Sequence, residues 1–202
     1  MSIENGVFGS RASFKARCML DYEKLGDFIR HCKGLNLKIV LTSGSFDILH
    51  PGHVRYLEKA RECGDLLVVG VDSDTKIEER KHRPAAVPEM ERLEMLAYQR
   101  PVDIVTLKTP EMPKWALVKV VQPDVLIRST GSKGYSAEEN EVLKEFCGEI
   151  RALEPQGTQS TSARIRKMYI HGAGMLATKI ETKMTAVVPQ IVESSMRELE
   201  NG

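Results

Sequence analysis

Short apolar runs alternate with amphipathic segments along most of the chain. Five of the runs are typical of buried strands, and they cover residues 38–42, 65–74, 102–108, 123–129 and 149–154. Between them, apolar residues recur at three- and four-residue intervals, which predicts helices. We place these helices from Asp21 to Gly34, over 54–62, 88–99, 113–122 and 136–148, and from Ser160 onward. The alternation predicts an α/β fold with a doubly wound, parallel, five-stranded, Rossmann-like sheet.

Three segments depart from this alternation. Residues 1–20 are polar and aperiodic, so we expect a flexible N-terminal arm before a domain over 21–170. Residues 77–88 are rich in charge and contain Glu-Arg-Lys-His-Arg-Pro, which we interpret as a charged loop. Residues 171–202 follow the last expected strand and form a C-terminal helical extension.

The extension carries an apolar stripe with helical spacing. Its members are Leu176, Ile180, Met184, Val187, Val188, Ile191, Val192, Met196 and Leu199. Pro189 interrupts the stripe and should kink the helix or divide it in two. The stripe must be buried either on the same chain or on a partner subunit. Both alternatives stay open at this point, and the second predicts a homo-oligomer, a dimer or higher.

Composition narrows the class of protein. The 202 residues suit one α/β domain with some extra material, and a net charge of +1 does not favour nucleic acid or membrane partners. We find no secretory signal and no apolar run long enough to span a membrane. The four cysteines have neither zinc-like nor C-x-x-C spacing, so we expect reduced thiols and a cytoplasmic location.

The chemistry concentrates where the first strand ends. Small residues there leave backbone N–H groups open to an anion, and the helix beginning near Gly52 adds a partial positive charge. His50 and His53 lie at the start of this helix and can donate hydrogen bonds to phosphate oxygens. A zinc site is the weaker interpretation, because no third ligand follows at a fixed spacing. Asp47 suits a structural role in fixing the turn.

The stretch from Val40 to Asp65 resembles the first signature of the cytidylyltransferase-like nucleotidyltransferases, whose hallmark H-x-G-H is His50-Pro51-Gly52-His53 here. Residues 160–167, Ser-Thr-Ser-Ala-Arg-Ile-Arg-Lys, resemble the family's second hallmark, a Ser/Thr-rich helix start. The resemblance covers roughly residues 20–170. It is closest to the ADP-heptose synthase branch, heptose-1-phosphate adenylyltransferase, and extends to glycerol-3-phosphate cytidylyltransferase. Further matches to that branch are Ser73-Asp74, Arg83-Pro84 and Arg92.

This resemblance implies a fold of the HUP type and a specific reaction. A nucleoside triphosphate, ATP or CTP, would donate its nucleoside monophosphate to a phosphorylated sugar or polyol and release pyrophosphate, with Mg²⁺ as cofactor. No metal site made of protein side chains is expected. The implied catalytic residues are His50, His53 and Arg128. The implied phosphate-binding residues are Thr42, Ser43, Gly44, Ser45, Phe46, Gly52, Ser160, Thr161 and Ser162.

For the acceptor, we consider Asp74, Lys81, Arg83 and Lys133. Each has a plainer alternative: Asp74 could cap a loop, and the cations of the charged segment could simply be solvated. The segment 129–136, Ser-Thr-Gly-Ser-Lys-Gly-Tyr-Ser, departs from the Gly-Gly-Asp-Tyr of the close branch. ATP against CTP, and the identity of the acceptor, therefore stay open.

Other functions compete with this one. A glycerol-3-phosphate-type cytidylyltransferase and a non-catalytic nucleotide sensor on the same fold both fit the motifs. A class I aminoacyl-tRNA synthetase fragment shares the histidine signature. The chain is short for that class, however, and it lacks a clear Lys-Met-Ser-Lys-Ser motif.

Overall fold

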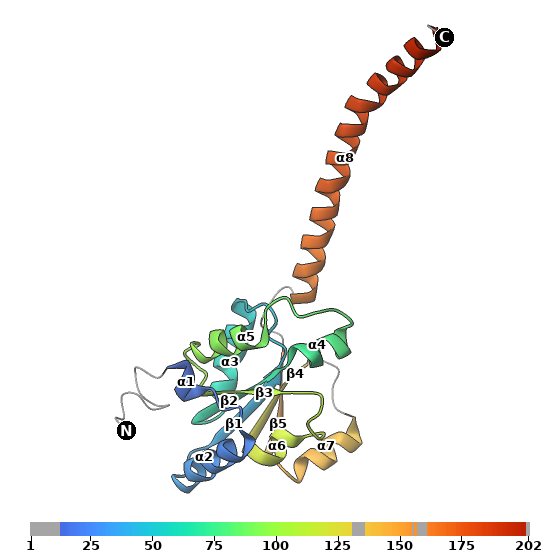
Figure 1. Cartoon of the computed structure of the whole chain (residues 1–202). Helices are drawn as coiled ribbons and strands as arrows, with labels where there is room; N and C mark the ends of the chain where they lie inside the picture. Colours follow the sequence, from blue (N-terminus) through green and yellow to red (C-terminus); the bar gives the residue numbers. More distant parts are fainter. Residues whose placement is uncertain (1–12, 131–135, 155, 157–160, 201–202) are drawn as a thin grey trace. The chain divides into compact units, whose positions relative to one another are not determined.

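The computed structural model describes residues 13–130, 136–154, 156 and 161–200 of the chain. It divides into two compact units, 1–158 and 159–202, and each is described by itself. The first is an α/β unit, and the second consists of helix α8, Thr161–Glu200 (Figure 1).

The described part of the α/β unit contains one parallel sheet in the order β3-β2-β1-β4-β5. Its strands are β1 (Ile39–Gly44), β2 (Leu66–Asp72), β3 (Ile104–Lys108), β4 (Val125–Ser129) and β5 (Glu149–Leu153). This confirms the predicted fold class and the number of strands. Because β1 pairs with β2 on one side and β4 on the other, the strand order reverses at β1. In such sheets, ligands bind at the carboxyl ends of the strands beside this reversal.

Helices cover both faces of the sheet and bury two apolar layers. The helices of this unit are α1 (Phe14–Arg17), α2 (Tyr22–Gly34), α3 (Pro51–Arg61), α4 (Asp74–Lys81), α5 (Glu89–Ala97), α6 (Ala116–Val121) and α7 (Ala137–Lys144). One layer joins α3 and α5 to the sheet, and the other joins α2, α6 and α7 to the opposite face (Figure 1). Successive β1 residues alternate between the layers, as strand geometry requires: Val40 lies in the first, Ile39 and Leu41 in the second.

Side-chain caps explain why several helix boundaries were readable in the sequence. The Asp21 carboxylate accepts hydrogen bonds from the first backbone N–H groups of α2. Ser136 and Glu139 form a reciprocal capping box at the start of α7. Both caps satisfy N–H groups that have no partner inside the helix.

The expected loop over 77–88 is wrong in its first part, because α4 occupies residues 74–81. Ser73 caps this helix by accepting a hydrogen bond from the Lys76 N–H at 3.1 Å. Acidic Asp74 in the first turn and basic residues in the last turn suit the helix dipole. Only Ile77 is buried, so the segment shows almost none of the apolar periodicity by which a helix is recognised.

The described part of the expected flexible arm, residues 13–20, also differs from the expectation. It forms α1 and then runs beside edge strand β3. There Cys18 forms an isolated parallel β-bridge with Val105, and the Met19 N–H donates a hydrogen bond to the Val105 carbonyl. Arg17 donates to the carbonyls of Ala97 and Val102 at 2.9 and 3.1 Å. This segment covers part of an otherwise open sheet edge.

Helix α8 unites two segments that the sequence suggested were separate. It begins with the Ser/Thr-rich segment and continues as one helix through Pro189. Of the two outcomes expected at this proline, a kink or a division, the division does not occur. Wherever the structure describes its side chains, they are exposed. Within the described ranges, no helix combines the length and apolar character needed to cross a membrane.

We predict that Arg17→Ala lowers the free energy of unfolding by about 1–3 kcal/mol, because two carbonyls lose a charged donor. Lys15→Ala, at an exposed position of the same helix, is the matched control and should have no effect. Urea denaturation of both variants measures the difference. If Arg17→Ala had the same free energy of unfolding as Lys15→Ala, the hydrogen bonds of Arg17 would contribute nothing to stability.

Candidate active site

The loop after β1 begins with a turn in which an aromatic ring packs closely on a glycine. Phe46 has φ 44°, in the left-handed region that residues other than glycine rarely adopt. Its ring is buried against Gly44, where an added Cβ would lie 3.2 Å from the ring. The missing side chain therefore lets the aromatic ring fold back over the end of the strand.

Arg92 of α5 stabilises this turn, and its side chain is buried, with only 1% exposed. Its guanidinium donates to the carbonyls of Ser45, Asp72 and Val87 at 2.6, 2.7 and 2.9 Å, and to the Asp74 carboxylate at 2.6 Å. One side chain thus joins the β1 loop, the end of β2, the start of α4 and the segment before α5.

Cations approach the hydroxyl groups of this loop from neighbouring elements. Lys108 Nζ, at the end of β3, lies 3.2 Å from Ser43 Oγ. Lys81 Nζ, at the end of α4, lies 2.9 Å from Ser45 Oγ. The sequence indicated a charged segment, and the structure brings its Lys81 directly to the loop after β1.

Asp47 anchors the far side of the loop, as its expected structural role requires. It pairs with Arg83 at 2.7 Å and accepts backbone N–H bonds from Ala86 and Val87. Burial by itself would raise the pKa of the Asp47 carboxyl. The hydrogen bonds from Arg83 and the backbone outweigh burial and hold the pKa below its ordinary value.

The surroundings of Lys81 and Lys108 disfavour the charged form of both side chains. Burial lowers the pKa of Lys108, and its pairing with Asp72 only partly opposes this. Burial also lowers the pKa of Lys81, and nearby Arg80 and Arg83 lower it further. Because a bound anion would relieve both penalties, the region favours negatively charged ligands.

The histidines of the H-x-G-H motif lie together at the start of α3. Their rings stack with centroids 3.8 Å apart, and His53 meets the Phe46 ring edge-on at 5.3 Å. His50 is the N-cap of α3, and its Nδ1 accepts the Gly52 N–H at 3.1 Å. In the neutral ring this bond assigns the proton to Nε2, which is therefore a donor. No cluster of three potential metal-ligating side chains occurs among the described residues.

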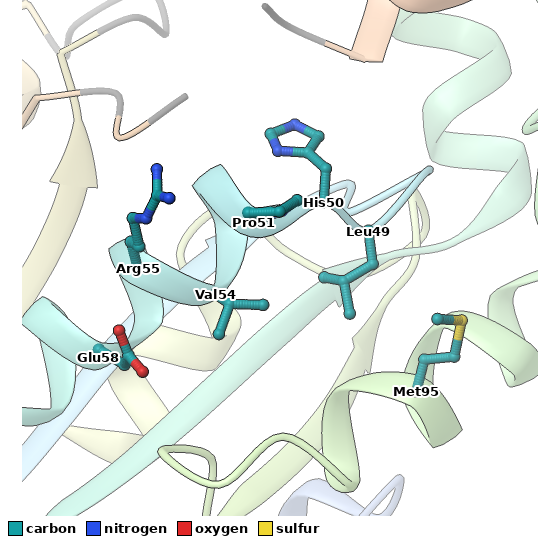
Figure 2. Close-up of a pocket in the computed structure, with 7 residues that line it drawn as sticks. All are labelled: Leu49, His50, Pro51, Val54, Arg55, Glu58 and Met95. Atoms are coloured by element: carbon teal, nitrogen blue, oxygen red, sulfur yellow. The ribbon is translucent and has the colours of Figure 1, made fainter. Parts of the chain in front are cut away.

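An open, mainly apolar groove runs along the outer side of α3 toward α5. In Figure 2 the side chains of Leu49 and Val54 point toward Met95, whereas His50 and Arg55 project the other way. The groove therefore offers few donors to a phosphate.

A second cavity of about 210 Å³ lies at the end of β1. Its polar lining residues include Ser43, Lys76, Lys108, Thr109 and Lys114, and Lys114 is paired with Glu139. Its apolar lining includes Leu41, Trp115 and Leu117, with Tyr22 beside them. Tyr22 closes one side by donating to the Leu107 carbonyl at 3.0 Å, and burial raises its pKa to about 12. Ser43, near the end of β1, lines this cavity and contacts Lys108, so the cavity reaches the end of the strand from which the loop starts.

Sequence reasoning missed Lys76, Lys108 and this cavity. A lysine that ends a strand looks like any solvated charge. The available signal was position, because Lys108 ends a parallel strand at the edge of the sheet where ligands bind.

Comparison with known proteins identifies the family. A family model described as cytidylyltransferase-like matches residues 41–184. The chain belongs to the cytidylyltransferase-like family. This membership confirms the resemblance carried by the H-x-G-H stretch, and with it the predicted enzyme class, a nucleotidyltransferase.

Curated members similar to this chain are named "Bifunctional protein HldE". The protein from a Nitratiruptor species is 34% identical over 149 residues, which are 73% of this chain and 31% of that protein. The one from Helicobacter pylori (strain HPAG1) is 38% identical over 152 residues, which are 74% of this chain and 31% of that protein. The chain thus spans about a third of the length of these relatives.

Solved structures of two proteins resemble this cytidylyltransferase-like chain. The lipopolysaccharide core biosynthesis protein from Thermoplasma volcanium GSS1 aligns with a TM-score of 0.52 and 26% identity, over 58% of this chain and 96% of that one. Pantoate-beta-alanine ligase from Francisella tularensis aligns with a TM-score of 0.50 and 12% identity, over 72% of this chain and 69% of that one. The second likeness supports the fold alone.

The structure gathers Ser43, Gly44, Ser45, Phe46, Gly52 and both histidines around one loop. Thr42 differs from these, because it is buried and its hydroxyl contacts Tyr56 at 2.8 Å and the Ile127 carbonyl at 3.2 Å. Its side chain therefore anchors the strand and is not presented to a ligand.

Asp74 is also committed to the fold. Its carboxylate accepts from Arg92 and from the Glu89 N–H at 3.1 Å, and its own N–H donates to Glu89 Oε2 at 2.8 Å. The capping alternative therefore describes Asp74 better than acceptor binding does.

The other predicted residues keep their roles as predictions. Arg128 is half-buried at the penultimate position of β4, near the carboxyl edge of the sheet. Lys133 and Ser160 lie outside the described residues, and so do the side chains of Thr161 and Ser162 in α8.

We predict that Arg92→Ala lowers the free energy of unfolding by about 3–5 kcal/mol, because buried acceptors on four segments lose one shared donor. Arg92→Lys should recover only part of this loss, since one ammonium group cannot match the planar fork. Arg100→Ala, at an exposed position, is the control. Denaturant titration measures all three, and a cost below about 1 kcal/mol for Arg92→Ala would contradict the anchoring role.

Proposed function

We propose that this chain transfers a nucleoside monophosphate from ATP or CTP to a phosphorylated sugar or polyol and releases pyrophosphate. The observation that carries the proposal is the stacked pair His50 and His53, held at a helix start beside a loop that cations surround. The relatives named HldE favour the ADP-heptose synthase type of reaction.

The proposed reaction needs no nucleophile from the protein. An oxygen of the acceptor phosphate attacks the α-phosphorus, and the bond between that phosphorus and the bridging oxygen of the β-phosphate breaks. The electron pair of that bond leaves with pyrophosphate. Negative charge accumulates on the non-bridging and leaving oxygens, where the Nε2–H of His50 and the His53 ring can donate. Alignment and charge neutralisation would account for the catalysis.

The cavity beside Ser43 supports a specific position for the acceptor. Lys76 and Lys108 bring two cations to its lining, and its size suits a small sugar or polyol phosphate. An acceptor phosphate held there would lie next to the loop that is proposed to hold the triphosphate. Among the residues expected to bind the acceptor, Lys81 and Arg83 would then serve the loop itself.

The expected Mg²⁺ belongs to the proposal in a limited form. The carboxylates near the loop do not fit a protein-built magnesium site, because Asp47 pairs with Arg83, and Asp72 pairs with Arg80 and Lys108. Magnesium would therefore enter with the triphosphate, whose oxygens are ligands it prefers.

Two further expectations accompany the proposal. A cytoplasmic location is part of the proposal, and the four cysteines, Cys18, Cys32, Cys63 and Cys147, would stay reduced there. A glycerol-3-phosphate-type cytidylyltransferase and a non-catalytic nucleotide sensor would use the same loop, so activity is the property that separates them.

We predict that His53→Ala lowers pyrophosphate release by about 10²–10³-fold, the usual cost of losing one donor to a developing charge. The assay combines the protein, Mg²⁺, each nucleoside triphosphate and a panel of sugar and polyol phosphates. His31→Ala is the matched control, because His31 is exposed on α2. A wild-type protein that binds a triphosphate but releases no pyrophosphate would be a sensor, and the transferase proposal would be wrong.

We also predict that Lys108→Gln raises the KM for the acceptor at least about tenfold, the effect of roughly 1.4 kcal/mol in binding. The KM for the nucleotide should change far less, since only the acceptor phosphate uses the cavity. Lys59→Gln, at an exposed position of α3, is the control. Equal effects on both KM values would assign Lys108 to the triphosphate and overturn the placement of the acceptor.

A further inference from the structure

Helix α8 carries a regular line of apolar side chains that its own unit does not bury. Tyr169, Ala173, Leu176, Ile180, Met184, Val187 and Ile191 follow one another at intervals of four, three, four, four, three and four residues. We call this set the α8 line. On a helix of 3.6 residues per turn, these intervals keep the side chains on one side. The six large members are 48% to 75% exposed.

The opposite side of the helix is mixed in character. The hydroxyls of Thr178, Thr182 and Thr185 donate to carbonyls four residues earlier, at 3.1, 2.8 and 2.8 Å. Pro189 falls on the same side by the helical repeat, and so do the exposed Met175 and Met196. The α8 line is thus the side on which apolar side chains follow one another without interruption, and a partner would bury it.

The described surface of the α/β unit offers no apolar line of comparable length. Met90 and Met95 lie on α5 and Tyr98 is its C-cap, and Met95 also lines the apolar groove beside α3. Helix α5 has 9 residues, so its apolar positions cannot match the full α8 line. The other exposed large apolar side chains lie on separate segments, namely Leu20, Leu35 and Val142. The surface that does match the α8 line in length and spacing is the same line on a second copy of the chain.

The spacing of the α8 line is symmetric about Ile180. Two antiparallel helices centred at this residue would therefore bring its members together in pairs: Leu176 with Met184, Ala173 with Val187, and Tyr169 with Ile191 of the other copy. A parallel pair in register would also match apolar residues, so charge must decide between the two orientations.

Charge favours the antiparallel pair. Residues 161–180 contain Arg164, Arg166, Lys167 and Lys179 and no acidic residue. Residues 181–200 contain four acidic residues, Glu181, Glu193, Glu198 and Glu200, against two basic ones. A parallel pair would align the two basic halves, whereas an antiparallel pair aligns each basic half with an acidic one.

We propose that α8 is a dimerisation element that pairs antiparallel with α8 of a second copy through the α8 line. The line advances 22 positions in six steps, about 3.7 residues per turn, which is an 11-residue repeat used twice. A repeat of this length exceeds the 3.6 residues of a straight helix, so the two helices should wind around each other with a slight right-handed supercoil. This pairing is independent of the proposed chemistry of the α/β unit.

Light scattering after size exclusion tests the pairing on the full chain. The wild type should have twice the 22.6 kDa mass of one chain, and Ile180→Asp should have the mass of one chain. Thr182→Asp, on the opposite side of the same helix, is the matched control and should remain a dimer. Circular dichroism verifies that both variants keep the α/β unit folded.

A monomeric wild type would overturn the proposal, and so would an Ile180→Asp variant that still dimerises. If the wild type is monomeric and sediments with anionic lipid vesicles, the α8 line is a membrane-binding surface instead. Retained pyrophosphate release by Ile180→Asp would show that loss of the dimer and loss of the proposed function are separate events.

Cysteine cross-linking tests the orientation. Under mild oxidation, a mixture of Ala173→Cys and Val187→Cys chains should form a disulfide-linked dimer, because these positions face each other only in the antiparallel pair. Neither variant alone should cross-link. The wild type controls for the native cysteines, of which Cys32, Cys63 and Cys147 are buried. A dimer from Ala173→Cys alone would show a parallel pair and overturn the orientation.

Discussion

The conformation of the loop after β1 depends on the buried guanidinium of Arg92. Arg92 satisfies acceptors on four segments that are far apart in the sequence, and few other side chains could do so, because only arginine offers five donors in a rigid plane. A buried cation is tolerated only when its hydrogen bonds are made. The turn at Phe46, and the contact of that ring with His53, therefore rest on a network that is costly to break.

Around this anchor, the fold concentrates positive charge where strand order reverses. Lys81 and Lys108 contact loop hydroxyls, and the one carboxylate within the loop, Asp47, is already paired with Arg83. Burial lowers the pKa values of both lysines, so a polyanion would offset the cost of keeping these two cations charged. The proposed phosphate binding and the proposed transfer reaction would thus share one physical cause. The stacked histidines add donors at the point where the reacting phosphorus would gain charge.

The two units of the chain differ in how much of their apolar surface they bury themselves. The α/β unit buries two apolar layers on the faces of its own sheet, and its short segment 13–20 protects part of an edge. Helix α8 has no second layer within its unit, so its apolar line remains for another molecule. Its symmetric spacing and the division of charge between its two halves suit the proposed antiparallel pairing with a second copy of the same helix.

Much of the fold and the centre of the site were readable from local patterns. Strand runs, capping residues such as Asp21 and Ser136, and the His50–His53 spacing each act within a few residues, so the sequence alone determined them. Tertiary structure decided the rest. Arg17 reaches carbonyls 80 and 85 residues away, Lys108 meets Ser43 across 65 residues, and Thr42 turns inward to Ile127 across 85. Helix α4 has a single buried residue, so it is recognised through its contacts and not through its pattern. These features depend on which segments the sheet brings together, and local spacing carries no information about that.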